Sequence, residues 1–455
     1  MLHTFLKFIF TSALSIFFKE YKVVNKTDIP EEGPLIVVSN HPSTFMDPII
    51  VSNLLKQDAH FIGKGTLFNS VLKNWFMRNI VKAIPIYRRQ DNAGKAQNNE
   101  AIFEQCFQFL EEKGTLFIFP EGTSIHERKL QDIKTGTARI ALGAEARNNF
   151  NLGVRILSVG INYSDAPSFR SDVWVNVEEL IHVKDYQAAY EKDDRQAVNL
   201  LTDKIQKNLE NNLIIADDEQ EDQFIKNVEA IYKNELISAL NLDPKLHAFT
   251  LTKGIQEAVN HFEDLDETWL EALQEKVADY TRRLSNNNLE DKFLARDKNQ
   301  ESNIFSDSLL RLFFLVLGLP LYLYGLLTNY LPYHLPQAIA ESLTKDEEYM
   351  GPIKMTAGIF TFSVFYSVLV YLFQRFIAHG DWWWTVFFAL SLPIAGFFAL
   401  LYAQRYNNLI THGRLIALFY SQPALIGELL AERKAIIKEL DWAKEQYLKE
   451  AITLQ

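Results

Sequence analysis

The sequence predicts an N-terminal α/β domain, with a mixed β-sheet flanked by helices, followed by a helical region and a C-terminal transmembrane helical hairpin. Short β-branched runs alternate with helical patterns in the first part of the chain, which is typical of α/β domains. Charged helical patterns then dominate, and long apolar stretches begin at residue 309. We therefore expect a helix at 1–20, an α/β domain at 21–184, a soluble helical region at 185–303, a membrane region at 304–405 and cytoplasmic C-terminal helices at 406–455.

Hydrophobic periodicity predicts the elements of the α/β domain. Short apolar runs predict strands at 35–38, 60–63, 83–87, 115–119, 156–162 and 173–177. Helical patterns lie between them at 48–55, 67–81, 98–112 and 136–147. Asp47 followed by Pro48 predicts a helix start, with Asp47 at the N-cap and Pro48 at the first helical position.

The N-terminus and the composition limit the class of protein. Residues 1–18 are mostly apolar without a cleavage pattern after them, so we expect a retained helix that lies either on a membrane surface or in the core. The formal net charge of -11 argues against nucleic acid as a partner. Cys106 is the only cysteine, which excludes an intrachain disulfide and fits a reducing, cytoplasmic setting for the soluble part.

Three apolar stretches, at 309–331, 356–376 and 382–402, predict the membrane region. Trp382, Trp383 and Trp384 head the third stretch, and tryptophan favours the headgroup boundary of a bilayer. Only residues 377–381 separate the last two stretches, so we expect these two to span as a tight hairpin. The alternative for each stretch is a buried core helix.

Basic residues flank the membrane region on both sides, and the positive-inside rule puts both flanks in the cytoplasm. An even number of crossings follows. We therefore expect residues 309–331 to bend back at Gly318–Leu319–Pro320 as a re-entrant segment, or to lie shallow, with three full crossings as the alternative. The protein is then a multi-pass membrane protein whose α/β domain lies on the cytoplasmic side.

One histidine and one aspartate are the first candidates for chemistry. His41 follows the apolar run 35–38, and Asp47 comes after five intervening residues. Polar side chains at the carboxyl end of a buried strand lie where α/β folds place their active sites. A histidine can act as a base near neutral pH, and a carboxylate can fix its tautomer. Because residues six apart do not share a helix face, a turn must bring the two together.

A second polar segment, at the end of the strand predicted at 115–119, contains Glu121, Gly122, Thr123 and Ser124. Glycine-containing turns of this kind present backbone N–H groups to anions. Positive charge also follows predicted strands at Lys64 and Arg88, and arginine suits phosphate. Together these positions favour a phosphate-bearing ligand. The sequence shows no nucleophile elbow, no P-loop spacing and no Cys/His cluster for a metal.

These residues resemble the phospholipid/glycerol acyltransferases, the lysophosphatidate and glycerol-3-phosphate acyltransferase superfamily. The resemblance covers about residues 21–180, and its blocks agree in order and spacing as well as identity: Asn40-His41 to Asp47, Gly63-Lys64 to Phe68, Ile86-Tyr87-Arg88, Phe119 to Ser124, and a strand-like block at 156–161. The family usually has four residues between the histidine and the aspartate, whereas this chain has five and its His-Pro start resembles a sub-branch with a longer loop. Ser158 replaces the proline of the last block.

The resemblance implies transfer of a fatty acyl group from a thioester to a glycerol hydroxyl. His41 would take the hydroxyl proton and Asp47 would hold the imidazole, so no serine or cysteine nucleophile and no cofactor is required. By resemblance, Arg88 and the turn at Glu121 and Gly122 hold the acceptor phosphate, with Thr123, Ser124 and Lys64 as further contacts.

The expected acceptor is 1-acyl-sn-glycerol-3-phosphate, with glycerol-3-phosphate as the alternative, and the expected donor is acyl-CoA or an acyl carrier protein thioester. A second enzymatic hypothesis is that the protein acylates other lysophospholipids during remodelling. The non-enzymatic hypothesis is a membrane protein whose α/β domain only binds lipid or scaffolds partners. The presence of His41, Asp47 and Glu121 argues against it.

Overall fold

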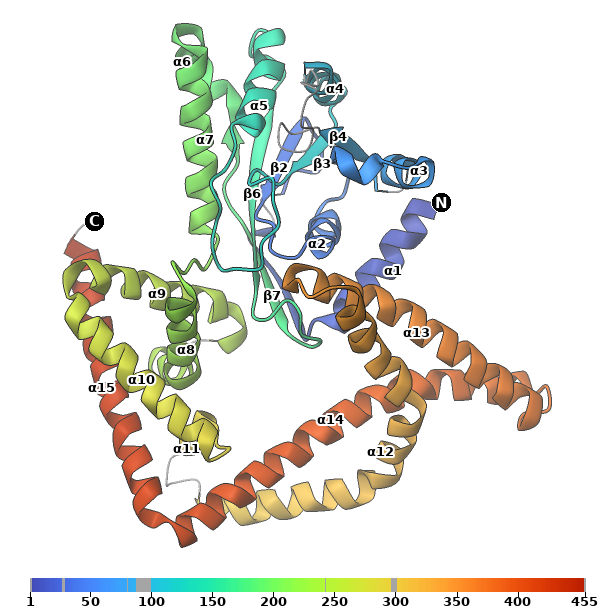
Figure 1. Ribbon diagram of the computed structural model, residues 1–455, viewed down its shortest axis with the longest axis vertical. Helices are drawn as coiled ribbons and strands as arrows, with labels where there is room; N and C mark the ends of the chain where they lie inside the picture. The colour runs from blue at the N-terminus through green and yellow to red at the C-terminus, as the bar shows by residue number, and fades with distance from the viewer. Residues whose placement is uncertain are drawn as a thin grey trace. The chain divides into compact units, whose positions relative to one another are not determined.

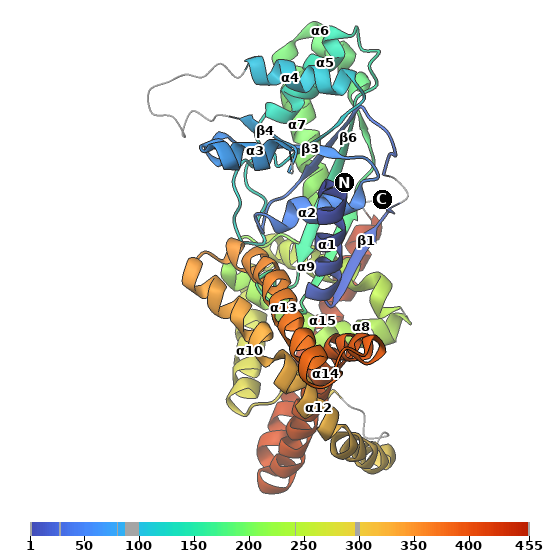
Figure 2. The ribbon, with the colours of Figure 1, turned by 90° about the vertical axis from the view of Figure 1, so that its right-hand side faces the viewer.

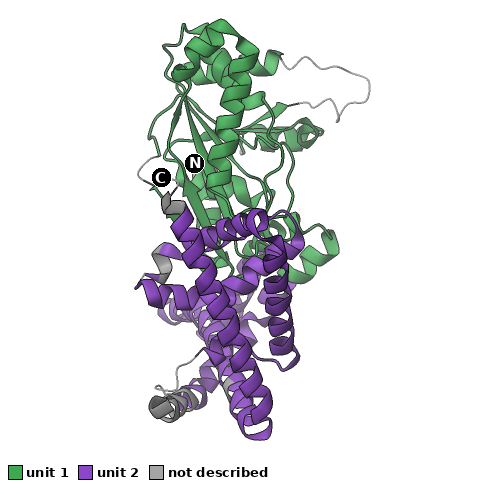
Figure 3. Ribbon diagram, turned by 90° about the vertical axis from the view of Figure 1, so that its left-hand side faces the viewer, with its two compact units in different colours: residues 1–215, 336–359 green, residues 216–335, 360–455 purple. Residues whose placement is uncertain are grey.

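The computed structural model describes residues 2–26, 29–79, 81–86, 100–241, 243–295 and 301–453. The chain divides into two compact units (Figure 3). Unit 1 comprises residues 1–215 together with 336–359, and unit 2 comprises residues 216–335 together with 360–455. Unit 1 contains all the sequence blocks described above.

Unit 1 is built on a mixed sheet of eight strands (Figure 1). Seven of them follow the order β1-β7-β6-β2-β5-β3-β4, and β8 pairs with β6. The pairs from β6 through β2, β5 and β3 to β4 are parallel, whereas β7 and β8 run antiparallel to β6. The strands are β1 (Glu20–Val24), β2 (Leu35–Ser39), β3 (Ala59–Lys64), β4 (Ala83–Ile86), β5 (Thr115–Ile118), β6 (Arg155–Tyr163), β7 (Asp172–Val177) and β8 (Ile181–His182).

Each predicted strand is present, with ends within a residue or two of the prediction, except that Tyr87 lies outside the described residues. β1 and β8 were not expected from the sequence. Every residue of β2 is buried, and the strand is apolar from Leu35 to Val38, as expected for a central parallel strand that is covered on both faces.

Alternate residues of β2 enter two different apolar clusters. Leu35 and Val37 pack with α1 (Leu2–Phe17) and α2 (Met46–Leu54), which Figure 2 shows in front of the sheet. Ile36 and Val38 pack on the other face with α4, α5 and α7. These helices are α4 (Glu100–Glu111), α5 (Gly136–Arg147) and α7 (Asp194–Asn211). Further helices among the described residues are η2 (Gly65–Phe68), α3 (Val71–Asn79), η4 (Val183–Tyr186) and α6 (Gln187–Lys192).

Helix α1 is a core helix at its C-terminal end. Leu14 and Phe17, with the following Phe18, are almost fully buried in the cluster that contains α2. Phe5 and Phe8, nearer the N-terminus, are 60% and 70% exposed. The C-terminal part therefore follows the core interpretation, and the exposed phenylalanines leave a membrane-surface role for the first turns as a prediction.

Unit 1 is larger than the sequence predicts. It continues past residue 184 to residue 215, because Leu201, Ile205 and Leu209 of α7 complete the core on one face of the sheet. Residues 336–359 also belong to it, since Met355 packs in the cluster on the opposite face. A long-range contact of this kind leaves no local pattern in the sequence.

Unit 2 is helical in its described residues. Its apolar core joins α8, α9, α10 and α11 with Leu415 of α14 and the side chains of α15. A buried ion pair between Arg433 and Asp291, with Nε and Oδ1 2.9 Å apart, crosses this core, and Tyr280 donates to the same carboxylate at 2.6 Å. The helices are α8 (Glu219–Leu240), α9 (Pro244–Leu265), α10 (Glu267–Asn286), α11 (Asp291–Leu294), α12 (Glu301–Leu343), α13 (Glu347–Phe376), α14 (Trp382–Ser421) and α15 (Pro423–Thr453), of which α12 and α13 contribute residues to both units.

Three of these helices are long and apolar enough to cross a membrane: residues 313–343 of α12, all of α13 and all of α14. The expected reversal at Gly318–Leu319–Pro320 is wrong, because α12 runs through it as one continuous helix. Proline removes one backbone hydrogen bond and kinks a helix, but it does not turn the chain back, and apolar surroundings favour unbroken helical hydrogen bonding.

Helices α13 and α14 follow each other closely, as predicted for the hairpin. The rings of Phe373 and Phe388 stack with centroids 4.1 Å apart, so the two helices are in contact near their connection. Asp381 caps α14 by accepting from the backbone N–H groups of Trp383 and Trp384. That these helices span as a hairpin stays a prediction.

Candidate active site

Two neighbouring strands bring the principal motifs to the same edge of the sheet. β2 and β5 pair in parallel, with Val38 opposite Ile118. The segment containing His41 leaves β2, and the segment containing Glu121 leaves β5. Because parallel strands end at the same edge, two motifs that are 80 residues apart meet there.

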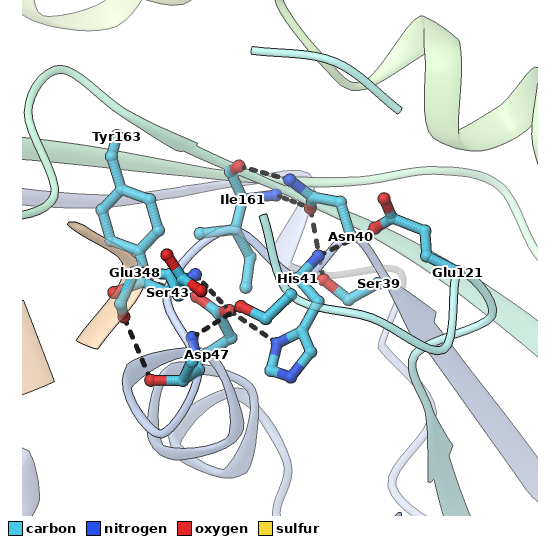
Figure 4. Close-up of polar contacts among 11 residues, drawn as sticks. Ser39, Asn40, His41, Ser43, Asp47, Glu121, Ile161, Tyr163 and Glu348 are labelled. Atoms are coloured by element: carbon cyan, nitrogen blue, oxygen red, sulfur yellow. Dashed lines mark hydrogen bonds and ion pairs between the residues drawn. The ribbon is translucent and has the colours of Figure 1, made fainter. Parts of the chain in front are cut away.

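His41 and Asp47 are in direct contact, as the sequence predicts (Figure 4). Nδ1 of His41 lies 2.8 Å from Oδ2 of Asp47. The imidazole stacks on the ring of Phe119, with centroids 3.6 Å apart, which fixes its plane. The side chain of Asp47 is fully buried, whereas that of His41 is 19% exposed. The arrangement therefore leaves Nε2 on the side of the ring away from the carboxylate (Figure 4).

Asp47 is not the N-cap that the sequence predicts. Helix α2 begins one residue earlier, at Met46, and Asp47 lies in its first turn. Its carboxylate accepts from the backbone N–H of Ser43 at 2.8 Å and from the hydroxyl of Tyr163 at 2.6 Å, in addition to His41. A carboxylate in the first turn still benefits from the helix dipole, so the favourable electrostatics remain although the cap is absent.

Tyr163, at the end of β6, was missed by the sequence analysis. Burial raises the pKa of its phenol well above the ordinary value, and the charge of Asp47 adds to this effect. The hydroxyl therefore stays protonated and donates to Asp47. Three donors converge on Asp47, so the carboxylate is the acceptor in each contact, and the Nδ1 proton of His41 is assigned from this network.

Both carboxylate oxygens of Glu121 make contacts within the protein, and its expected contact with the acceptor phosphate stays a prediction. Its two oxygens accept from the backbone N–H of His41 at 2.9 Å and of Gln131 at 3.0 Å. The side chain is 6% exposed, and burial raises its pKa above the ordinary value. Glu121 thus ties the loop after β5 to the loop that carries His41, and its geometry is that of a positioning group.

Other residues of this loop also contact the segment that carries His41. Ser124 accepts through Oγ from the backbone N–H of Thr44 at 3.2 Å, and the N–H of Ile125 donates to the carbonyl of His41 at 3.3 Å. The N–H of Gly122 donates to the carbonyl of Phe119, and its φ of 72° is one that glycine adopts without strain. Thr123 is exposed.

The sequence predicts two cationic contacts, Lys64 and Arg88, and the structure describes only the first. Lys64 is the exposed last residue of β3, and β3 pairs in parallel with β5, so Lys64 lies at the same edge of the sheet as His41. Arg88 lies outside the described residues. In the described ranges, no group of three or more His, Cys, Asp or Glu residues could hold a metal ion.

Asn40 joins the site to the neighbouring strand, which the sequence also did not reveal. Its amide nitrogen donates to the carbonyl of Ile161 at 2.9 Å, and its oxygen accepts from the N–H of the same residue at 2.8 Å (Figure 4). This pairing extends the contact between β2 and β6 beyond the last ladder pair of β2, Ser39 opposite Val159. It fixes the backbone immediately before His41.

A family model matches the part of the chain that contains His41, Asp47 and Glu121. Residues 20–162 match the model of the family described as Acyltransferase. These residues form an acyltransferase domain. The match agrees with the resemblance to the phospholipid/glycerol acyltransferases drawn from the sequence. The acyltransferase domain thus includes His41, Asp47 and Glu121, whereas Tyr163 follows its last matched residue.

Two curated relatives are similar to this chain over limited lengths. Glycerol-3-phosphate O-acyltransferase 1 of Saccharomyces cerevisiae is 22% identical over 312 residues, which cover 50% of this chain and 41% of the relative. Glycerol-3-phosphate O-acyltransferase 2 of the same organism is 31% identical over 142 residues, which cover 30% of this chain and 19% of the relative. The chain spans less than half the length of either protein.

Among solved structures, the crystal structure of the 1-acyl-sn-glycerophosphate (LPA) acyltransferase PlsC from Thermotoga maritima is similar at 18% sequence identity. The likeness covers 46% of this chain and 79% of that chain, with a TM-score of 0.34.

Proposed function

We propose that the protein transfers a fatty acyl group from an acyl thioester to a free hydroxyl of a glycerol-3-phosphate acceptor. The observation that carries the proposal is the contact between His41 and Asp47 within the acyltransferase domain, with the second imidazole nitrogen left for substrate. Asp47 holds the tautomer in which Nδ1 carries the proton, so Nε2 has the lone pair that a general base needs.

The chemistry then needs one base and no protein nucleophile. Nε2 of His41 takes the proton of the acceptor hydroxyl while the hydroxyl oxygen forms a bond to the thioester carbonyl carbon. The C–S bond breaks next, and the thiolate takes the proton from the imidazolium. Asp47 stabilises the positive charge that His41 carries between these steps, and the stacked Phe119 keeps the ring in place.

The acceptor is glycerol-3-phosphate or its 1-acyl derivative. The names of both yeast relatives favour glycerol-3-phosphate, whereas the sequence alone favoured the 1-acyl form. We propose Lys64, Arg88 and Thr123 as contacts of the acceptor phosphate, since a phosphate requires cationic or hydroxyl donors. The donor is acyl-CoA or an acyl carrier protein thioester.

We further propose that the apolar helices anchor the protein in a bilayer, with the acyltransferase domain on the cytoplasmic side. Three helices of suitable length and the basic residues that flank the region support this. Membrane anchoring suits the reaction, because an acylated glycerol phosphate partitions into the bilayer.

A radiolabelled-acceptor assay tests the proposal. The purified protein is incubated with labelled glycerol-3-phosphate or its 1-acyl derivative, each with acyl-CoA and with an acyl carrier protein thioester. The wild type should acylate one acceptor, whereas His41→Ala and Asp47→Asn should lose activity by about 10³-fold or more, as expected when a base or its orienting carboxylate is removed. His182→Ala, a change at an exposed histidine on β8, is the matched control. Equal turnover by wild type and His41→Ala would overturn the assignment, as would no acylation in any of the four substrate pairs.

A further inference from the structure

The first turns of α13 contact the loops of the acyltransferase site, although they lie about 300 residues further along the chain. The hydroxyl of Thr44 donates to the carbonyl of Glu348 at 3.0 Å, and Figure 4 shows Glu348 beside the loop of Ser43 and Asp47. Nε2 of His126 lies 3.7 Å from a carboxylate oxygen of Glu347. All of these residues belong to unit 1.

A third contact involves the turn between β6 and β7. Nζ of Lys354 donates to the carbonyl of Pro167 at 2.8 Å. Gly351 is buried against Ala166, so closely that an added Cβ would lie 2.4 Å from the carbonyl oxygen of Ala166. Met355 is 4% exposed and belongs to the same apolar cluster as Met46 and Tyr163.

Each of these three segments also lies next to a residue that hydrogen-bonds to His41 or Asp47. Thr44 follows Ser43, whose backbone N–H donates to Asp47. His126 follows Ile125, whose N–H donates to the carbonyl of His41. The turn of Ala166 and Pro167 follows Tyr163, whose hydroxyl donates to Asp47.

We propose that residues 347–355, the first turns of α13, are a positioning element of the acyltransferase site that keeps His41 and Asp47 in their productive geometry. The element touches no reacting atom in this arrangement; it acts through Thr44, His126 and the turn after β6. The inference depends on the proposed function, because it concerns the same histidine and aspartate.

Two glycines of α13 give a matched test of this element. Gly351→Ala forces a Cβ against the backbone of Ala166, whereas Gly358→Ala, two turns later in the same helix, meets only Cγ of Pro336, at an ordinary 4.0 Å. Displacing catalytic groups by about 1 Å can cost about 10²-fold in rate, so we expect Gly351→Ala to lower kcat by about ten-fold or more while KM for the acceptor stays within about two-fold. Gly358→Ala should match the wild type.

A second pair of variants covers the case in which Gly351→Ala fails to fold. Thr44→Val removes the hydroxyl that donates to Glu348, and Thr44→Ser retains it. We expect kcat to fall several-fold in the valine variant and to recover in the serine variant, with KM unchanged in both.

The outcomes separate this inference from the proposed function. A wild type without activity would overturn the proposed function and the inference with it. An active wild type, with kcat retained in Gly351→Ala and in Thr44→Val, would overturn the inference alone. A higher KM at unchanged kcat would also overturn it, because that result assigns α13 to acceptor binding. If Gly351→Ala does not fold, the two Thr44 variants decide.

Discussion

The hydroxyl of Tyr163 donates to Oδ1 of Asp47 at 2.6 Å, although 116 positions separate the two residues along the chain. His41 occupies the other carboxylate oxygen at 2.8 Å. The orientation of the His41 imidazole therefore depends on β6 as well as on the loop that carries the sequence motif.

Tyr163→Phe should lower kcat by about ten-fold, because a hydrogen bond to a charged group contributes about 1.5–3 kcal/mol and its loss lets the carboxylate rotate away from His41. KM for the acceptor should change little. Steady-state kinetics with the labelled acceptor measure both constants. Tyr190→Phe, which removes a hydroxyl from α6, is the matched control. Unchanged kcat in Tyr163→Phe would show that the Ser43 amide alone suffices to hold Asp47.

The rate should depend on pH through the imidazole of His41. A general base works only when it is unprotonated. We expect kcat/KM to fall as pH is lowered, with the uptake of one proton by the free enzyme. The profile is measured with a slow acyl donor, so that the chemical step limits the rate. A flat profile from mildly acid to mildly alkaline pH would contradict a histidine base.

Glu121 should make a pH-dependent contribution to stability. Burial raises the pKa of its carboxyl above the ordinary value of 4.5, so the folded state binds the proton more tightly than the unfolded state. The stabilising contribution of the protonated form is complete below about pH 4.5 and is lost as pH rises through the raised pKa. The melting temperature of the wild type minus that of Glu121→Gln should therefore fall as pH rises from about 4.5 through the raised pKa of Glu121. Above that pH the difference should stay constant.

Thermal unfolding of both proteins in one detergent, from pH 4 to pH 8, measures this difference. The effects of pH on other groups cancel in the difference between the two melting temperatures, because these groups are common to both proteins. A difference in melting temperature that rises with pH would show that the two backbone donors to Glu121 outweigh its burial.

Asn40→Ala should destabilise unit 1. The substitution leaves the buried N–H and carbonyl of Ile161 without their side-chain partners, at a cost of about 2–4 kcal/mol in the free energy of unfolding. Ser158→Ala is the matched control on the same strand. The hydroxyl of Ser158 is buried without a hydrogen-bond partner in the described part of the chain, so its removal should not lower the free energy of unfolding. Equal stability of the two variants would contradict the role assigned to Asn40.

The sequence by itself determined the α/β class, the six main strands and the pairing of His41 with Asp47. These features depend on local patterns: apolar runs of strand length, helical periodicity and a short polar loop after a buried strand. The same reasoning placed Asp47 at a helix cap, which is wrong, because the helix starts at Met46, two residues before the predicted start at Pro48. The carboxylate contacts Ser43, Tyr163 and His41 instead.

Only the tertiary structure decided which groups hold that pair in place. Glu121 reaches the backbone of His41 across 80 positions, Tyr163 reaches Asp47 across 116, and Glu348 reaches Thr44 across 304. Contacts over such separations arise from the order of strands in the sheet and from the packing of the first turns of α13 within unit 1, and neither leaves a periodic signal along the chain. The tertiary structure also showed that α12 continues through Pro320. The proline removes one backbone hydrogen bond, and the helical hydrogen bonds on either side of it maintain the helix.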